Sequence, residues 1–131
     1  MIVHALRLHP GQDLRDELER FVAEKNIKAG VILTCVGSLT RATLRMADET
    51  ITKDFEERFE ITGLSGTLCP DNNHLHITIS DKDGRAFGGH LKKGCLVYVT
   101  AELVIAELPD LTFSRAFDQE TGFDELQISN A

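Results

Sequence analysis

Three histidines of this chain, His74, His76 and His90, have the residue type and the spacing of a metal-binding site. Neutral imidazoles suit zinc and similar divalent cations, and three of them leave a fourth coordination position open to water, a carboxylate or a ligand. Zinc held in this way lowers the pKa of a bound water to about 7 and so creates a nucleophile. This chemistry depends on whether the chain brings His90 beside the other two histidines.

Residues 74–80 predict a strand that carries the first two histidines on its polar face. Polar and apolar residues alternate strictly along this segment, which places His74 and His76 on one side of the strand. The other side carries the apolar residues Leu75, Ile77 and Ile79. This pattern is typical of a half-buried strand.

The turn that follows decides whether His90 joins the site. A two-residue turn at Asp83-Gly84 would place His90 opposite Ile77, on the apolar face. A three-residue loop of residues 82–84, with Gly84 in the left-handed conformation, pairs His76 with His90 instead. That register also puts the apolar residues of the second strand, Phe87 and Leu91, on the apolar face of the first. We therefore predict the three-residue loop.

Three charged residues elsewhere in the chain are candidates for catalytic roles beside a bound metal. Glu60 is the last charged residue of a highly charged segment, residues 51–61, which predicts a solvated or edge strand. Its carboxylate could fill the open metal position or act as a base. Arg45 and Arg115 could supply an electrostatic clamp. Nothing in the sequence fixes their distances from the histidines.

The remaining pattern predicts one α+β domain, residues 1–131, with a compact, mostly antiparallel β-sheet and one main helix. Asp13 is the expected N-cap of an amphipathic helix whose apolar stripe is Leu14, Leu18, Phe21 and Val22. Gly37-Ser38 is expected to interrupt a strand as a turn or bulge, or to present backbone N–H groups to an anion. The other expected strands are residues 2–8, 31–36, 39–46, 61–69, 95–108, 111–117 and 123–128.

The composition is that of an ordinary soluble domain with a strongly acidic balance. A net charge of −7 and a pI near 5.1 disfavour DNA binding by the isolated domain, because such a surface repels phosphate backbones. No membrane span or secretory segment is indicated, so we expect a cytoplasmic protein. The three cysteines, Cys35, Cys69 and Cys95, are widely spaced, and we expect them to be buried and reduced.

Several motifs resemble the plants-and-prokaryotes-conserved (PPC) domain family, also called DUF296. In chain order these motifs are Pro10-Gly11, the segments 36–39 and 42–44, Arg58 to Ile61, the segment 64–67, His74-Leu-His-Ile, Gly88-Gly89-His90-Leu91, and Thr121 to Leu126. In its plant members, which are nuclear proteins, the domain follows AT-hooks. This sequence has no AT-hook core.

The resemblance implies a compact β-rich fold that assembles as a homotrimer. It also implies an association with DNA, because proteins of this family are named for DNA binding. A trimer would also explain the long apolar run of residues 95–108, as a strand buried on both faces or partly against another subunit. Three hypotheses follow from the residues and the resemblance together. The chain is a trimeric regulatory or DNA-associated module with a three-histidine metal site, a metal-dependent enzyme acting on a small molecule, or a protein in which the metal is purely structural.

Overall fold

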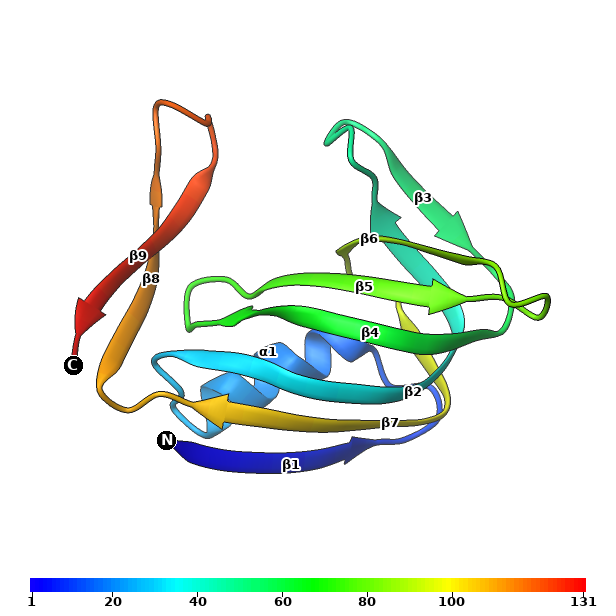
Figure 1. The fold of residues 1–131 in the computed structure, drawn as a ribbon, viewed down its shortest axis with the longest axis horizontal. Helices are drawn as coiled ribbons and strands as arrows, with labels where there is room; N and C mark the ends of the chain where they lie inside the picture. The colour runs from blue at the N-terminus through cyan, green and yellow to red at the C-terminus, as the bar shows by residue number, and fades with distance from the viewer.

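The computed structural model of this protein describes residues 1–131 as one helix and nine strands (Figure 1). The predicted α+β class and the single main helix are confirmed. The elements in chain order are β1 (Ile2–Leu8), α1 (Leu14–Glu24), β2 (Gly30–Arg45), β3 (Thr52–Phe55), β4 (Phe59–Leu68), β5 (His74–Ser80), β6 (Ala86–Leu91), β7 (Leu96–Glu107), β8 (Leu111–Phe117) and β9 (Asp124–Asn130).

Seven strands form one antiparallel sheet that curls back on itself. The strand order is β1-β7-β2-β4-β5-β6, and β3 pairs with β2 beside this path. The long strand β2 also pairs with β6 at its C-terminal end, where Leu44 lies opposite Leu91 and Arg45 opposite His90. Strands β2, β4, β5 and β6 therefore form a closed ring of pairings, and this closure carries Arg45 to the third histidine.

Strand β2 runs without interruption through Gly37-Ser38, where the sequence predicted a break between two strands. The ladder between β2 and β7 shifts register between Gly37 and Leu39, which agrees with the bulge that was one of the predicted alternatives and not with a turn. A side chain at Gly37 would collide with the backbone carbonyl oxygen of Thr100 on β7. Close packing of two backbones, rather than a turn, is the reason for glycine at this position.

Helix α1 packs its predicted apolar stripe on the inner face of the sheet. Leu14, Leu18 and Val22 are buried and belong to one hydrophobic core of 23 residues. The side chain of Asp13 caps the helix by accepting a hydrogen bond from the backbone N–H of Asp16 (3.0 Å). The cysteines, Cys35, Cys69 and Cys95, are free and buried, as predicted. The helix is too short and too polar to cross a membrane.

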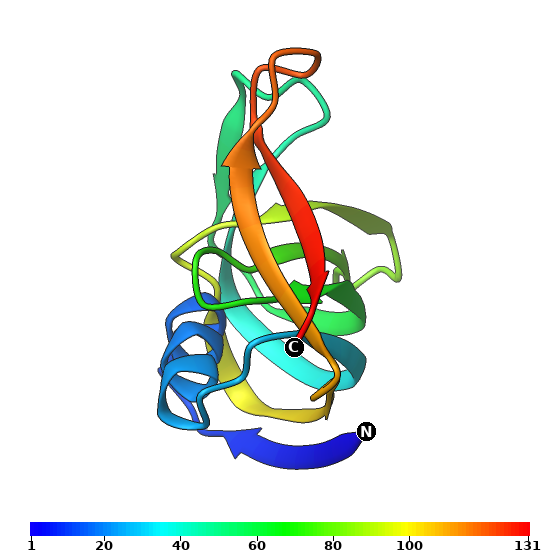
Figure 2. The same cartoon turned by 90° about the vertical axis from the view of Figure 1, so that its left-hand side faces the viewer.

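Strands β8 and β9 pair only with each other and form a hairpin arm that extends along one side of the body (Figures 1 and 2). A small second core fixes its base, where Phe113 is buried against Ala29 and Cys69. Farther along the arm, the backbone N–H of Arg115 donates to the carboxylate of Asp71 (3.1 Å), and its guanidinium donates to the hydroxyl of Thr67 (3.0 Å). The arm is thus attached beside the end of β4 and the start of β5.

We predict that Gly88→Ala lowers the free energy of unfolding by about 1–3 kcal/mol, because its new Cβ would meet the backbone carbonyl oxygen of Ile77 and force β5 and β6 apart. Urea denaturation measures the change. Gly63→Ala is the matched control, since nothing lies within 4 Å of a Cβ at that position. Equal effects of the two substitutions would contradict the close approach of the two strands as the constraint on Gly88.

Candidate metal centre

The hairpin of β5 and β6 has the predicted three-residue loop. The backbone N–H of Asp81 donates to the carbonyl oxygen of Arg85 (3.0 Å), and Gly84 has a φ of 80°, in the left-handed region. In the resulting register His76 lies opposite His90 and Thr78 opposite Gly88. The apolar face of the hairpin is turned into the core, where Leu75, Ile77, Ile79 and Leu91 are at most 2% exposed.

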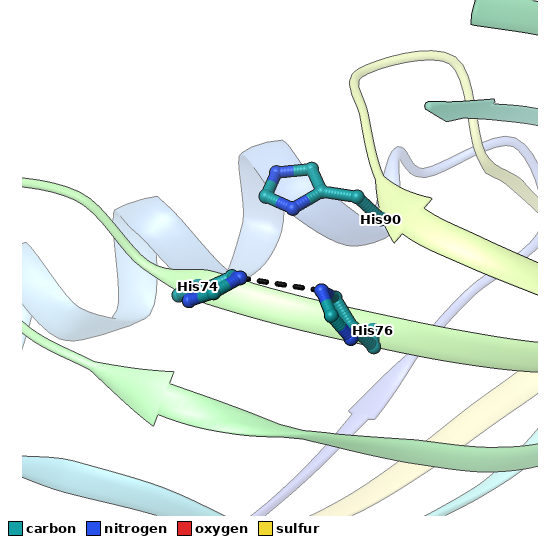
Figure 3. Close-up of side chains that lie close together, drawn as sticks. All are labelled: His74, His76 and His90. Carbon is teal, nitrogen blue, oxygen red and sulfur yellow. Dashed lines mark hydrogen bonds between the residues drawn. The ribbon is translucent and has the colours of Figure 1, made fainter. Parts of the chain in front are cut away.

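The three imidazole rings point toward one another above the polar face of this hairpin (Figure 3). The Nε2 atoms of His74 and His76 are 3.2 Å apart, and the ring centroids of His90 lie 5.2 Å from His74 and 5.7 Å from His76. One nitrogen of each ring can be chosen so that all three lie within 4.8 Å of one another. The residues predicted from the sequence are therefore brought together.

This donor set fits a divalent cation. Ligand atoms at 2.0–2.1 Å from a tetrahedral zinc are roughly 3.3 Å apart, close to the separation of the His74 and His76 nitrogens. The Nδ1 atom of His90 is buried and has no hydrogen-bond partner. A buried polar atom without a partner is unfavourable, and coordination of a cation by this nitrogen would remove the penalty.

The surroundings of His74 and His90 favour neutral rings, as metal coordination requires. Burial, followed by the positive charge of Arg45, lowers the pKa of His90 from 6.5 to about 4. Burial also lowers the pKa of His74, and His76, Arg115 and Arg45 act in the same direction. Free nitrogen lone pairs are therefore available at neutral pH.

Two of the three charged residues proposed from the sequence lie at this site. Arg45 and Arg115 line the same cavity as the histidines, a hollow of about 780 Å³. Glu60 does not line it. It lies opposite Ser80, four residues along β5 from His76, or roughly 13 Å at 3.3 Å per residue.

Acidic residues of the arm, and not Glu60, line the cavity beside the histidines. Asp124 and Glu125 line the cavity together with Phe123, and the negative charge of Glu125 acts on His74, where it opposes the lowering of the pKa. These residues belong to the Thr121–Leu126 segment, which carried part of the family resemblance but suggested no role. Their approach to the histidines depends on how the arm is placed, which no local pattern records.

Comparison with known proteins identifies the family. The Plants and Prokaryotes Conserved (PCC) domain, which is the PPC domain named above, matches residues 1–109. The chain belongs to the PPC domain family. The matched residues include all three histidines and Arg45, whereas the arm lies beyond them.

Two relatives show that this PPC domain is also found within longer proteins. This chain is 52% identical to a protein from Synechococcus named bifunctional protein GlmU. The match covers 126 residues, which are 96% of this chain but only 20% of that protein. The chain is 29% identical over 111 residues, 78% of its length, to AT-hook motif nuclear-localized protein 2 of Arabidopsis thaliana, and spans 33% of it.

Solved PPC structures share the fold over nearly their whole length. A hypothetical protein from Salmonella is 45% identical, with a TM-score of 0.96 over 98% of this chain and 94% of that one. A protein from Archaeoglobus fulgidus described as metal-containing is 30% identical, with a TM-score of 0.85 over 97% and 94%. A Bacteroides thetaiotaomicron protein with a provisional DNA-binding name is 26% identical, with a TM-score of 0.86 over 95% and 91%.

We predict that Arg45→Gln raises the pKa of His90 in the metal-free protein, because a neighbouring positive charge is removed. The pKa of His90 is below its ordinary value, so the neutral ring favours the folded state. Its contribution to stability is complete above about pH 6.5 and is lost as the pH falls toward 4. Arg45→Gln should make this loss smaller and end it at a higher pH, because the folded-state pKa moves toward the unfolded value. Histidine NMR titration measures the pKa, and Arg20→Gln, an exposed arginine paired with Glu17, is the control. An unchanged His90 titration would contradict the influence of Arg45.

Proposed function

We propose that this PPC domain is a metal-binding module in which His74, His76 and His90 hold a divalent cation, best matched by zinc, at the floor of a ligand-binding cavity. The observation that carries the proposal is the convergence of three imidazoles, with all three donor atoms within 4.8 Å, in the cavity. Three neutral nitrogen donors are the set that zinc uses when one position stays open for a ligand. The metal-containing Archaeoglobus fulgidus relative supports this assignment.

The setting of the histidines favours a functional metal over a purely structural one. Structural zinc sites are closed by four protein ligands, and the proteins that use them often do not fold without the ion. Here three ligands face an open cavity, and the hairpin that carries them is held by its own backbone pairing and by a buried apolar face. The metal is therefore not needed to hold β5 and β6 together.

The cavity also favours a small-molecule ligand over DNA as the partner of the metal. A hollow of about 780 Å³ lies within the range of small-molecule sites, whereas a DNA surface needs several cations spread along a face. The DNA-binding name of one relative concerns that protein, and the acidic balance of this chain, −7, opposes such a role for the isolated domain. Metal-dependent chemistry on a small molecule is thus the function that the site supports best.

We further propose that the domain assembles as a homotrimer. The outer face of the sheet, opposite α1, carries a row of apolar residues from β1, β2 and β7, of which Val3 is 56% and Val36 is 55% exposed. The arm presents three more large apolar side chains, Phe117, Phe123 and Ile128, that are between 47% and 66% exposed. Exposed apolar surface of this extent is typical of a protein interface. A contact between copies would cover it.

We predict that His76→Ala and His90→Ala each reduce zinc affinity at least about 100-fold, because each removes one of three donors. Elemental analysis and calorimetric titration measure the loss. His9→Ala is the control, since His9 is exposed in the loop before α1. The metal-free variants should keep their fold and oligomeric state. Unfolding or dissociation on metal removal would show a structural metal instead, and unchanged zinc content would refute the site.

We predict that Val36→Glu dissociates the trimer, because a carboxylate would then lie at the interface beside Glu102, which faces Val36 across β2 and β7. Sedimentation velocity measures the assembly. Lys82→Glu, an exposed residue of the hairpin loop, is the matched control and should leave the trimer intact. A monomeric wild-type protein, or a trimeric Val36→Glu variant, would contradict the proposed interface.

A further inference from the structure

The cavity around the histidines reverses the charge balance of the chain. The whole sequence has 14 basic and 21 acidic residues, whereas the cavity is lined by four cations and three carboxylates. The cations are Arg15, Arg45, Lys92 and Arg115, and the carboxylates are Glu49, Asp124 and Glu125. A concave surface that is locally cationic on an acidic protein attracts anions to that place and not elsewhere.

Three of these cations, Arg45, Lys92 and Arg115, have no carboxylate partner, and two of the three are arginines. Neither Arg45 nor Arg115 lies within 4.0 Å of an acidic group, in contrast to Arg15, which pairs with Glu19 (3.0 Å). The side chain of Arg45 makes no hydrogen bond, and that of Arg115 makes one, to the hydroxyl of Thr67. The Nε atoms of both are buried without a partner. Two guanidiniums with unused donors therefore line the same cavity as the three histidines.

These two arginines reach the cavity from opposite sides. Arg45 comes from the end of β2, where it lies opposite His90. Arg115 comes from the arm and donates a hydrogen bond to Thr67, the residue of β4 that lies opposite His74. Both side chains line the cavity that the three histidines also line.

We propose that this cavity binds a small-molecule anion, a carboxylate or phosphate ester, that Arg45 and Arg115 clamp while its charged group faces the three histidines. The planar fork of a guanidinium matches the paired oxygens of both groups. This inference rests on the proposed function for the metal that would share the anion. The cavity is larger than an inorganic ion needs, and Phe123 and Met46 give it apolar walls for the body of an organic ligand.

The test is calorimetric titration of zinc-loaded protein with inorganic phosphate and, separately, with acetate. We expect at least one of the two to bind at about 10 mM or below, and Arg45→Gln and Arg115→Gln each to weaken binding at least about tenfold with zinc content unchanged. Arg115→Lys should restore only part of the affinity, because it keeps the charge and loses the fork. Arg20→Gln, on the outer side of α1, is the control and should bind like the wild type.

A second measurement separates this inference from the metal proposal. In zinc-free protein, the Nε–Hε NMR signals of Arg45 and Arg115 should shift on addition of phosphate, while that of Arg20 should not. Shifts at both arginines in a protein that fails to bind zinc would uphold the anion clamp and refute the metal. Zinc binding without any anion binding, or equal anion affinity in both arginine variants and the wild type, would overturn the clamp. Displacement of phosphate by a short DNA duplex would overturn the small-molecule class.

Discussion

The site depends on the pairing of β5 with β6, which the three-residue loop ending at Gly84 determines. A register shift of one residue would turn His90 into the core and bring the apolar residues of β6 into water, because side chains alternate between the faces of a strand. The apolar face opposes that shift, since Leu75, Ile77 and Leu91 are almost completely buried. Burial on one side of the hairpin thus fixes the geometry of the polar chemistry on the other.

A second consequence of the fold is the concentration of positive charge around the three histidines. Closure of the sheet through β2 and β6 brings Arg45 to His90, and attachment of the arm to β4 brings Arg115 to the same cavity. Burial, together with these guanidiniums, lowers the pKa of His74 and of His90 and so favours neutral rings that can coordinate a metal. A divalent cation added among them would raise the local charge further, and an anionic ligand is the natural way to balance it.

Only part of the site lies within the residues that match the family. Residues 1–109, which match the PPC domain, hold the three histidines and Arg45, whereas Arg115 and Glu125 lie in the arm beyond this range. The histidine cluster therefore sits on the body of the domain, and the arm adds one cation and one carboxylate. The Synechococcus relative, of which this chain spans 20%, shows that a closely similar domain occurs within a much longer protein.

The sequence by itself determined the local features. Strict alternation in residues 74–80, a glycine at the left-handed position of the loop and Asp13 at the helix start each act over a few residues, and the strands, the cap and the convergence of the histidines followed from them. The continuity of β2 through Gly37 did not follow, because close contact with the backbone of β7 involves residues more than 60 positions away. Only the tertiary structure placed Arg45 and Arg115 at the histidines and Glu60 away from them. Pairings between distant strands and the attachment of the arm decide those positions, and no periodicity along the chain encodes them.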